Sequence, residues 1–304
     1  MKSVLPVLVV VAALIGLWYA AAVPMNVRGV LDEAERAGAE VVPASGAERR
    51  ERAVWTLVVR NPGAIPATWA QERPRLPAPH QVAAELWDTT AGKSITSKRS
   101  LVYHGWVTLS ATLLGFAIGT GLGILLAVGI VQSKVMDMSV MPWAIVSQTI
   151  PIIALAPMII VVLYSVGVQG IIPKAVISAY LSFFPVVVGM VKGLRSPDAM
   201  QLDLLRTYNA SAAQGLWKLR LPASMPYLFA SLKIGIAASL VGAIVGELPT
   251  GAVAGLGARL LAGSYYGQTV QIWSALFAAA ILAAALVGLL GLIERLVLRR
   301  MGVA

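Results

Sequence analysis

Few residues in this chain have the type and spacing needed for chemistry. The two histidines, His80 and His104, lie far apart, and there is no cysteine, so neither a metal centre nor a reactive thiolate is expected. Residues 91–94, AGKS, look like the end of a phosphate-binding loop, but Trp87 stands where that loop requires a glycine. No nucleophile elbow or carboxylate pair is apparent. We predict no catalytic residue, no metal site and no cofactor bound by this chain.

The composition is that of an integral membrane protein. Of 304 residues, 58% are hydrophobic and 12% are charged, and residues 105–191 contain three charged side chains: Lys134, Asp137 and Lys174. Such a stretch cannot supply the polar surface of a soluble domain. The net charge of +10 comes mostly from basic residues that flank apolar runs. This placement is typical of membrane topology and argues against nucleic-acid binding.

Six apolar runs are long enough to span a bilayer, since about 20 residues at a rise of 1.5 Å cross its core. We expect spans at about 3–23, 105–131, 139–164, 170–191, 224–246 and 271–293. The first run also resembles a secretory signal peptide, although its length favours a retained helix. The chain is therefore divided into a first transmembrane helix (1–23), an insert with an amphipathic helix (24–100) and a five-helix core (101–300).

The insert is expected to be exposed to water, because it carries 11 Lys or Arg, 9 Asp or Glu and 7 prolines. Within it, residues 31–40 are predicted to form a short polar helix and residues 53–59 a short strand or helical turn. Residues 81–90 are predicted to form an amphipathic helix.

Glycines mark one face of the second span. Gly115, Gly119 and Gly123 follow one another at four-residue spacing. Without side chains on that face, the backbone of a neighbouring helix can approach closely.

The third span contains helix-breaking residues. Pro142, Pro151 and Pro157 predict a kink or local unwinding, which persists at membrane depth only where protein or a water-filled cavity satisfies the freed backbone groups. The break serves either packing alone or a solute pathway. A carboxylate at the membrane edge is also costly, so Glu247 should face protein, water or a partner, either as an ion pair with Arg259 or as a solute contact. The candidate pathway residues are Gln148, Pro151, Tyr180 and Glu247.

Lysines and arginines in the short loops indicate sidedness. With the N-terminus inside, the inside segments carry Lys2, Lys134, Lys192, Arg195, Arg206, Lys218, Arg220, Arg295, Arg299 and Arg300, against Lys174 and Arg259 outside. Both termini are therefore expected in the cytoplasm. The insert at 24–100 is expected outside, which is the periplasm in a double-membraned bacterium.

Residues 203–222, DLLRTYNASAAQGLWKLRLP, interrupt the apolar spans with a basic amphipathic stretch. Helical spacing of apolar residues on each side of Asn209 predicts two short helices, and Asn tolerates the left-handed backbone that ends a helix. Such a pair suits docking into a groove of another protein. It equally suits lying on anionic lipid, and the residues alone leave both possibilities open.

This stretch resembles the EAA loop of binding-protein-dependent ABC importer permeases. Counting back from Leu221 and Pro222 puts Leu219 at the apolar position of the loop and Asn209 at its glycine, with Asp203, Leu204 and Leu205 at its Glu-Ala-Ala. The spacing matches throughout, whereas the residue types at several of these positions differ from those of the EAA loop. Residues 76–88, 147–167, 183–198 and 221–235 are also similar to the nitrate, sulfonate and taurine permease group, and the likeness covers about residues 76–300.

The resemblance implies an all-α integral membrane subunit with six transmembrane helices of the type I importer kind and a coupling loop at 193–222. It implies a second permease copy, a periplasmic or lipid-anchored binding protein and a cytoplasmic ABC ATPase that uses ATP and Mg, all at the bacterial inner membrane. The implied solute is pyrimidine-like, thiamine-precursor-like or riboflavin-like, with sulfonates and nitrate open. The residues expected to dock on the ATPase are Asp203, Leu204, Leu205, Arg206, Tyr208, Asn209, Leu219, Leu221 and Pro222.

Two other functions are compatible with the composition. An ATP-independent carrier or channel predicts internal repeats and paired intramembrane charges, and neither is apparent in the sequence. A membrane-anchored scaffold would instead use the insert as its active part.

Overall fold

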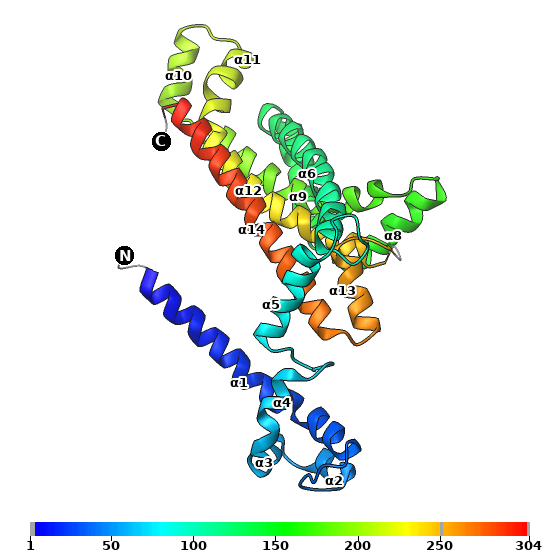
Figure 1. Ribbon diagram of the computed structural model, residues 1–304. Coiled ribbons are helices and arrows are strands. Elements are labelled where there is room, and N and C mark those ends of the chain that lie inside the picture. Colours follow the sequence, from blue (N-terminus) through cyan, green and yellow to red (C-terminus); the bar gives the residue numbers. More distant parts are fainter. Residues whose placement is uncertain (1–3, 250–251, 303–304) are drawn as a thin grey trace. The chain divides into compact units, whose positions relative to one another are not determined.

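The computed structural model describes residues 4–249 and 252–302, and every regular element within these ranges is helical. Five helices are long and apolar enough to cross a membrane, or six if one bent pair counts as a span. The elements, drawn in Figure 1, are α1 (Val4–Arg36), α2 (Gly46–Glu51), α3 (Val54–Arg60), η1 (Pro62–Ala64), α4 (Ile65–Ala70), α5 (Pro79–Trp87), η2 (Asp88–Gly92), α6 (Leu101–Gln132), α7 (Lys134–Ser147), α8 (Ile152–Ser165), α9 (Ile171–Leu194), α10 (Ala199–Thr207), α11 (Ala212–Gly215), η3 (Leu216–Arg220), α12 (Leu221–Glu247), α13 (Leu256–Tyr265) and α14 (Thr269–Arg300).

The chain divides into two compact units. The first comprises Met1–Val102 and Arg259–Ala278, and the second comprises Tyr103–Ala258 and Ala279–Ala304. The docking and pathway residues expected from the sequence all belong to the second unit.

In the first unit, α1 is longer than expected. It continues past residue 23 to Arg36, so residues 31–36, expected to begin a separate polar helix, are its last turns. An internal proline costs a helix roughly 3 kcal/mol, yet α1 passes through Pro24. Val27 and Leu31 on the following turns are buried in an apolar cluster beneath the insert. Burying each such side chain stabilises by about 1.5–3 kcal/mol, which offsets the cost of the proline.

The insert is packed around a buried arginine. Arg49 is 1% exposed and donates to Asp32 Oδ1 at 2.8 Å, to Glu35 and to two backbone carbonyls at 2.9 Å. Its hydrogen bond with Glu35 is the main reason why the pKa of Arg49 is raised, so the side chain stays charged at physiological pH. Residues 53–59 were expected as a strand or a helical turn, and nearly all of them lie in helix α3, which spans Val54–Arg60.

The second unit is built on close contacts between α6, α9 and α12. A Cβ added at Gly115, Gly119 or Gly123 of α6 would come within 3 Å of α9, and Gly242 of α12 lies equally close to it. The expected glycine face is therefore confirmed. Because lipid offers no hydrophobic driving force between helices, such small residues allow the close van der Waals packing that holds membrane helices together.

Substituting one glycine on this face tests the contact. In Gly119→Val, the new Cβ would lie 2.2 Å from Ser182 Oγ and 2.8 Å from the Ala179 carbonyl oxygen, and a backbone carbonyl cannot rotate away. We expect a lower thermal unfolding midpoint and loss of the monodisperse peak in size-exclusion chromatography. Gly121→Val is the matched control, since nothing lies within 4 Å of a Cβ there. Equal behaviour of the two variants would contradict the packing argument.

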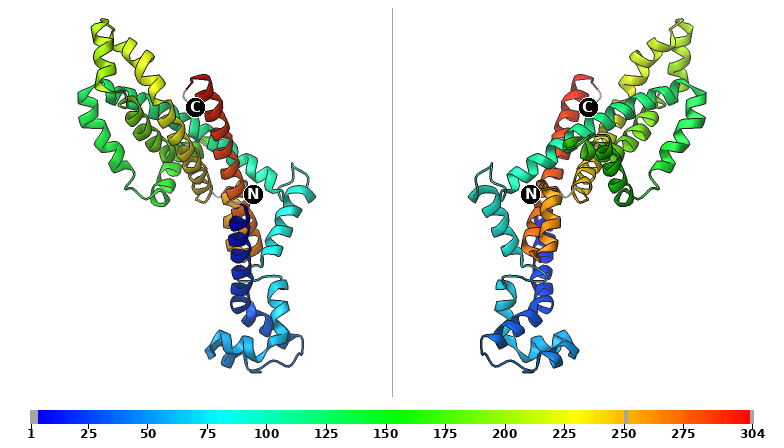
Figure 2. Two further views of the ribbon diagram at one scale, coloured as in Figure 1. Left: turned by 90° about the vertical axis from the view of Figure 1, so that its left-hand side faces the viewer. Right: turned by 90° about the vertical axis from the view of Figure 1, so that its right-hand side faces the viewer.

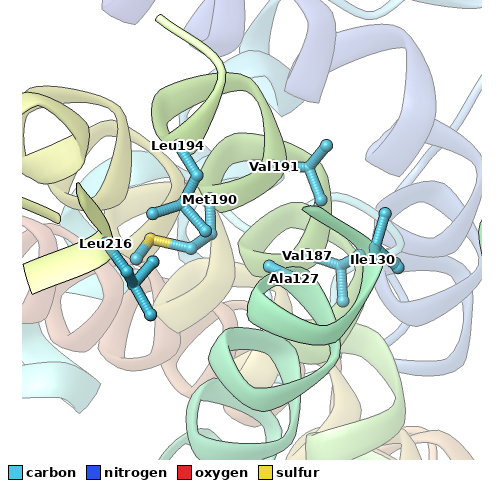
Figure 3. Close-up of a cluster of buried hydrophobic side chains, with 7 residues drawn as sticks. All are labelled: Ala127, Ile130, Val187, Met190, Val191, Leu194 and Leu216. Carbon is cyan, nitrogen blue, oxygen red and sulfur yellow. The ribbon is translucent and has the colours of Figure 1, made fainter. Parts of the chain in front are cut away.

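An aliphatic cluster lies at the end of the unit next to residues 203–222. It joins α6, α9 and η3, and its members, drawn in Figure 3, are Ala127, Ile130, Val187, Met190, Val191, Leu194 and Leu216. Leu216 comes from the stretch that leads into α12, so burial of this side chain fixes the stretch to the bundle. A hydrogen bond of 3.1 Å from Arg220 to the Leu194 carbonyl adds to this attachment.

The span expected at 139–164 is broken. Helices α7 and α8 meet at an angle of 102°, so the expected kink or unwinding is confirmed. The bend lies in the green segment of Figure 2. The C-terminal end of α6 borders a cavity together with α10 and α11. Tyr164 near the end of α8 borders a different cavity, together with the start of α9. The bent pair therefore leads from one end of the unit to the other, as a sixth span does.

Candidate functional site

The stretch at 203–222 begins with a helix that ends on a left-handed residue. Asn209 has φ +52° and is the one non-glycine residue with positive φ in the described ranges. The amide of Asn209 donates to the Arg206 carbonyl at 2.9 Å, and that of Ala210 donates to the Leu205 carbonyl at 3.0 Å. These two bonds form a Schellman motif, in which the left-handed position normally holds glycine. Asn209 thus has the turn geometry that the sequence led us to expect.

Helix α10 presents an apolar face to its surroundings. Met200, Leu204 and Tyr208 follow at four-residue spacing and are 83%, 58% and 78% exposed. On the other side of the helix, Leu202 and Leu205 line a cavity of about 370 Å³ shared with α6 and α11. The two leucines at the expected Glu-Ala-Ala positions therefore differ, because Leu204 points outward whereas Leu205 points into the unit.

Polar contacts stabilise this stretch. Asp203 and Arg206 form an exposed ion pair at 3.0 Å. Ser211 starts α11 with a capping box, accepting from the Gln214 amide at 3.3 Å while its own amide donates to the Gln214 side chain at 2.8 Å.

The chain then runs as one helical segment from Ala212 to Glu247. Leu219, Leu221 and Pro222 are half-buried where it enters the bundle. Figure 1 shows α10 and α11 beyond the ends of α9 and α12. A force on α11 can therefore reach the bundle through a continuous helix, and a force on α10 reaches it through the turn at Asn209.

Two of the candidate pathway residues lie at the break between α7 and α8, and a third contacts it. Gln148 follows the last residue of α7, and Pro151 precedes the first residue of α8. Tyr180 of α9 donates its hydroxyl to the Ser147 carbonyl, one of the groups that the break frees from helical hydrogen bonding. A protein side chain thus satisfies one of the backbone groups that the break leaves without a helical partner, as is required inside a bilayer.

The fourth candidate, Glu247, is fully buried at the end of α12. It accepts hydrogen bonds from Thr108 Oγ1 at 2.9 Å and from the Gly257 amide at 2.8 Å. Lys174 Nζ lies 3.9 Å from its Oε1. A buried carboxylate in a bilayer needs such partners, because each unsatisfied charge there is costly.

The same cluster caps the start of α13. The Leu256 amide donates to Thr108 Oγ1 at 2.8 Å, and the Gly255 amide donates to His104 Nδ1 at 3.0 Å. The first amides of a helix have no partner within it, and a carboxylate nearby complements the helix dipole. Glu247, Thr108 and His104 together hold the chain where it enters α13.

Sequence reasoning missed His104, Thr108 and Lys174 as members of this cluster. A signal was present, since His104, Thr108 and Thr112 follow at four-residue spacing in a largely apolar helix and so share one face. What they face depends on residues from α12 and α13, which no local pattern reveals.

Two expectations about charges were wrong. We expected an ion pair between Glu247 and Arg259. Glu247 instead pairs with Lys174 in the second unit. Arg259 pairs with Glu85 at 4.0 Å in the first unit. Paired charges between spans do exist: Lys233 of α12 lies 2.7 Å from a carboxylate of α14, Glu294 Oε2. No group of residues suited to hold a metal ion occurs in the described ranges.

Residues 119–303 match the family described as the binding-protein-dependent transport system inner membrane component. The chain belongs to this family. The match includes the whole of 203–222 and lies outside the insert at 24–100. It confirms the resemblance stated above, and with the helical structure it confirms the type I permease fold.

The relatives are permease subunits. The chain is 31% identical over 200 residues to a probable ABC transporter permease protein of Haemophilus influenzae, covering 66% of this chain and 76% of that protein. It is 30% identical to a riboflavin transport system permease protein of Chloroflexus aurantiacus, covering 74% and 80%. It is 32% identical to a formylaminopyrimidine transport permease protein of Halalkalibacterium halodurans, covering 60% and 68%. By its family, this permease is a membrane component of a transport system.

Proposed function

We propose that this permease is the membrane subunit of an ATP-driven importer and that α10 and α11 dock on a cytoplasmic ABC ATPase. The observation that best supports this proposal is the exposed apolar face of Met200, Leu204 and Tyr208, on a helix that ends at the left-handed Asn209. An amphipathic helix that lays its apolar side in a groove is a common mode of protein recognition. The ATPase uses ATP and Mg, while this chain binds neither.

The proposed sidedness follows from charge. Ten basic residues of the short loops lie on the side of 203–222 and two on the other, so that side is the cytoplasm and both termini lie there. The insert then lies outside the membrane. A second copy of the permease completes the pathway, and an outside binding protein, periplasmic or lipid-anchored, delivers the solute.

The proposed solute is small and polar or heterocyclic. Two relatives are named for riboflavin and formylaminopyrimidine transport, both ring compounds. A relative of Bacillus subtilis is named for aliphatic sulfonates and one of Synechocystis for nitrate, at 24% and 25% identity. The higher identities favour the heterocyclic class.

Copurification with the ATPase tests the docking surface. The double variant Leu204→Glu/Tyr208→Glu places two charges on the apolar face of α10, and the loss of two central contacts lowers affinity by roughly tenfold or more. We expect the ATPase to be lost from the purified complex. Val59→Glu is the matched control, since Val59 is equally apolar and 77% exposed but lies in the insert. Retention of the ATPase by the double variant would overturn the proposed docking.

A further inference from the structure

A cavity of about 410 Å³ lies at the end of the second unit opposite the docking stretch. Four side chains that can stack on or hydrogen-bond to a small molecule line it: Tyr103 and Ser110 of α6, Tyr164 of α8 and Lys174 of α9. Its remaining wall includes residues 252–254. Aromatic walls with few polar groups are typical of sites for small organic molecules.

One wall of the cavity is anchored at one end. Residues 252–254 lead directly into Gly255, Leu256 and Gly257, whose three amides donate to His104, Thr108 and Glu247 at 2.8–3.0 Å. Gly255 has φ +127°, and an added Cβ there would lie 2.2 Å from the Glu247 carboxyl carbon. The anchored end of this segment gives the cavity a preformed wall, which lowers the entropy lost on binding.

Lys174 connects the cavity to this anchor. Its side chain borders the cavity, and the residue is 9% exposed. Its Nζ lies 3.9 Å from Glu247 Oε1, which is an ion-pair distance longer than a hydrogen bond. An ammonium group carries three donors, so Lys174 can be held by the charge of Glu247 while it donates to a molecule in the cavity.

We propose that this cavity is a solute subsite for a small heteroaromatic ring with a neutral hydrogen-bond acceptor. Tyr103 and Tyr164 contact the ring, since aromatic pairs favour stacked or edge-to-face contact. Lys174 donates to the acceptor. Glu247 disfavours a full anion such as nitrate or a sulfonate, because the Lys174 ammonium group already faces the Glu247 carboxylate, whose negative charge repels a second anion. The inference rests on the proposed import function and names its solute class.

Equilibrium binding to the permease–ATPase complex in lipid nanodiscs tests the subsite, with the binding protein left out. The probes are radiolabelled riboflavin, formylaminopyrimidine and ethanesulfonate. We expect saturable binding of at least one ring compound and none of ethanesulfonate. Absence of ring binding, or tighter binding of ethanesulfonate, would overturn the subsite.

Variants separate solute contact from a structural role of Lys174. Lys174→Met combined with Glu247→Gln removes both charges of the pair and so leaves no unpaired buried charge. If Lys174 binds solute, the Kd of the ring compound rises roughly tenfold, since a hydrogen bond to a charged group is lost. Tyr103→Leu should weaken binding as well, with Tyr103→Phe as the matched control. An unchanged Kd in the double variant would overturn the assignment of Lys174.

A second assay measures ATP-dependent uptake by proteoliposomes that contain the complete importer. It distinguishes failure of the subsite from failure of the proposed import function. A wild-type complex that imports solute but binds no ring compound overturns the subsite alone. A complex without ATP-dependent import of any probe, sulfonate and nitrate included, overturns the proposed function itself.

Discussion

Replacing Asn209 with valine is expected to uncouple transport from ATP hydrolysis while the chain still inserts into the membrane. Asn209 has φ +52° at the end of α10. The left-handed conformation costs an ordinary L-residue about 1–2 kcal/mol, and more for a β-branched one. A cost of this size shifts the turn roughly tenfold away from its docking geometry. Substrate-stimulated ATPase activity and uptake by the reconstituted importer measure the effect.

Asn209→Gly is the matched control for this position. Glycine adopts positive φ without strain and is the residue usually found there. We expect this variant to retain uptake and stimulated ATPase activity. If the valine variant equals the glycine variant in both assays, the left-handed turn has no part in coupling.

Replacing Glu247 with alanine is expected to destabilise the second unit strongly. The change leaves Lys174 nearly buried without its counter-charge and removes the acceptor for the Gly257 amide. Breaking a buried ion pair by removing one partner costs about 3–5 kcal/mol. The unfolding midpoint of the purified complex should fall by on the order of 10 °C, as measured by differential scanning fluorimetry.

Two further variants identify the source of this loss. Glu247→Gln keeps a hydrogen-bond acceptor of nearly the same shape but loses the charge, so its midpoint should lie between wild type and alanine. Adding Lys174→Met to Glu247→Gln removes the unpaired ammonium group and should recover most of the remaining loss. An alanine variant as stable as wild type would show that the cluster does not hold α12 to α13.

The features that could be predicted from the sequence are those that depend on neighbouring residues in the chain. Long apolar runs predicted the spans, because bilayer thickness sets the length of a crossing helix. The glycines at 115, 119 and 123 predicted close packing, and the prolines of the third span predicted its break. The turn at Asn209 was also predictable, since its two hydrogen bonds reach back three and five residues.

Features that join distant residues could not be predicted in this way. The continuation of α1 through Pro24 depends on Leu57, a residue of the later helix α3 that packs against Val27 and Leu31 and helps to bury them. Leu204 and Leu205 are neighbours in the sequence, yet only the tertiary structure turns Leu205 toward the cavity that α10 shares with α6 and α11.

The sequence by itself determined the membrane class, the spans and the family resemblance, because hydrophobic length, turn chemistry and motif spacing are local properties. Only the tertiary structure decided the partners of Glu247. Arg259 is the nearer basic residue in the chain, but α9 packs against α12 and brings Lys174 to the carboxylate. Burial makes that pairing obligatory, and burial is a property of the packed helices rather than of any one segment.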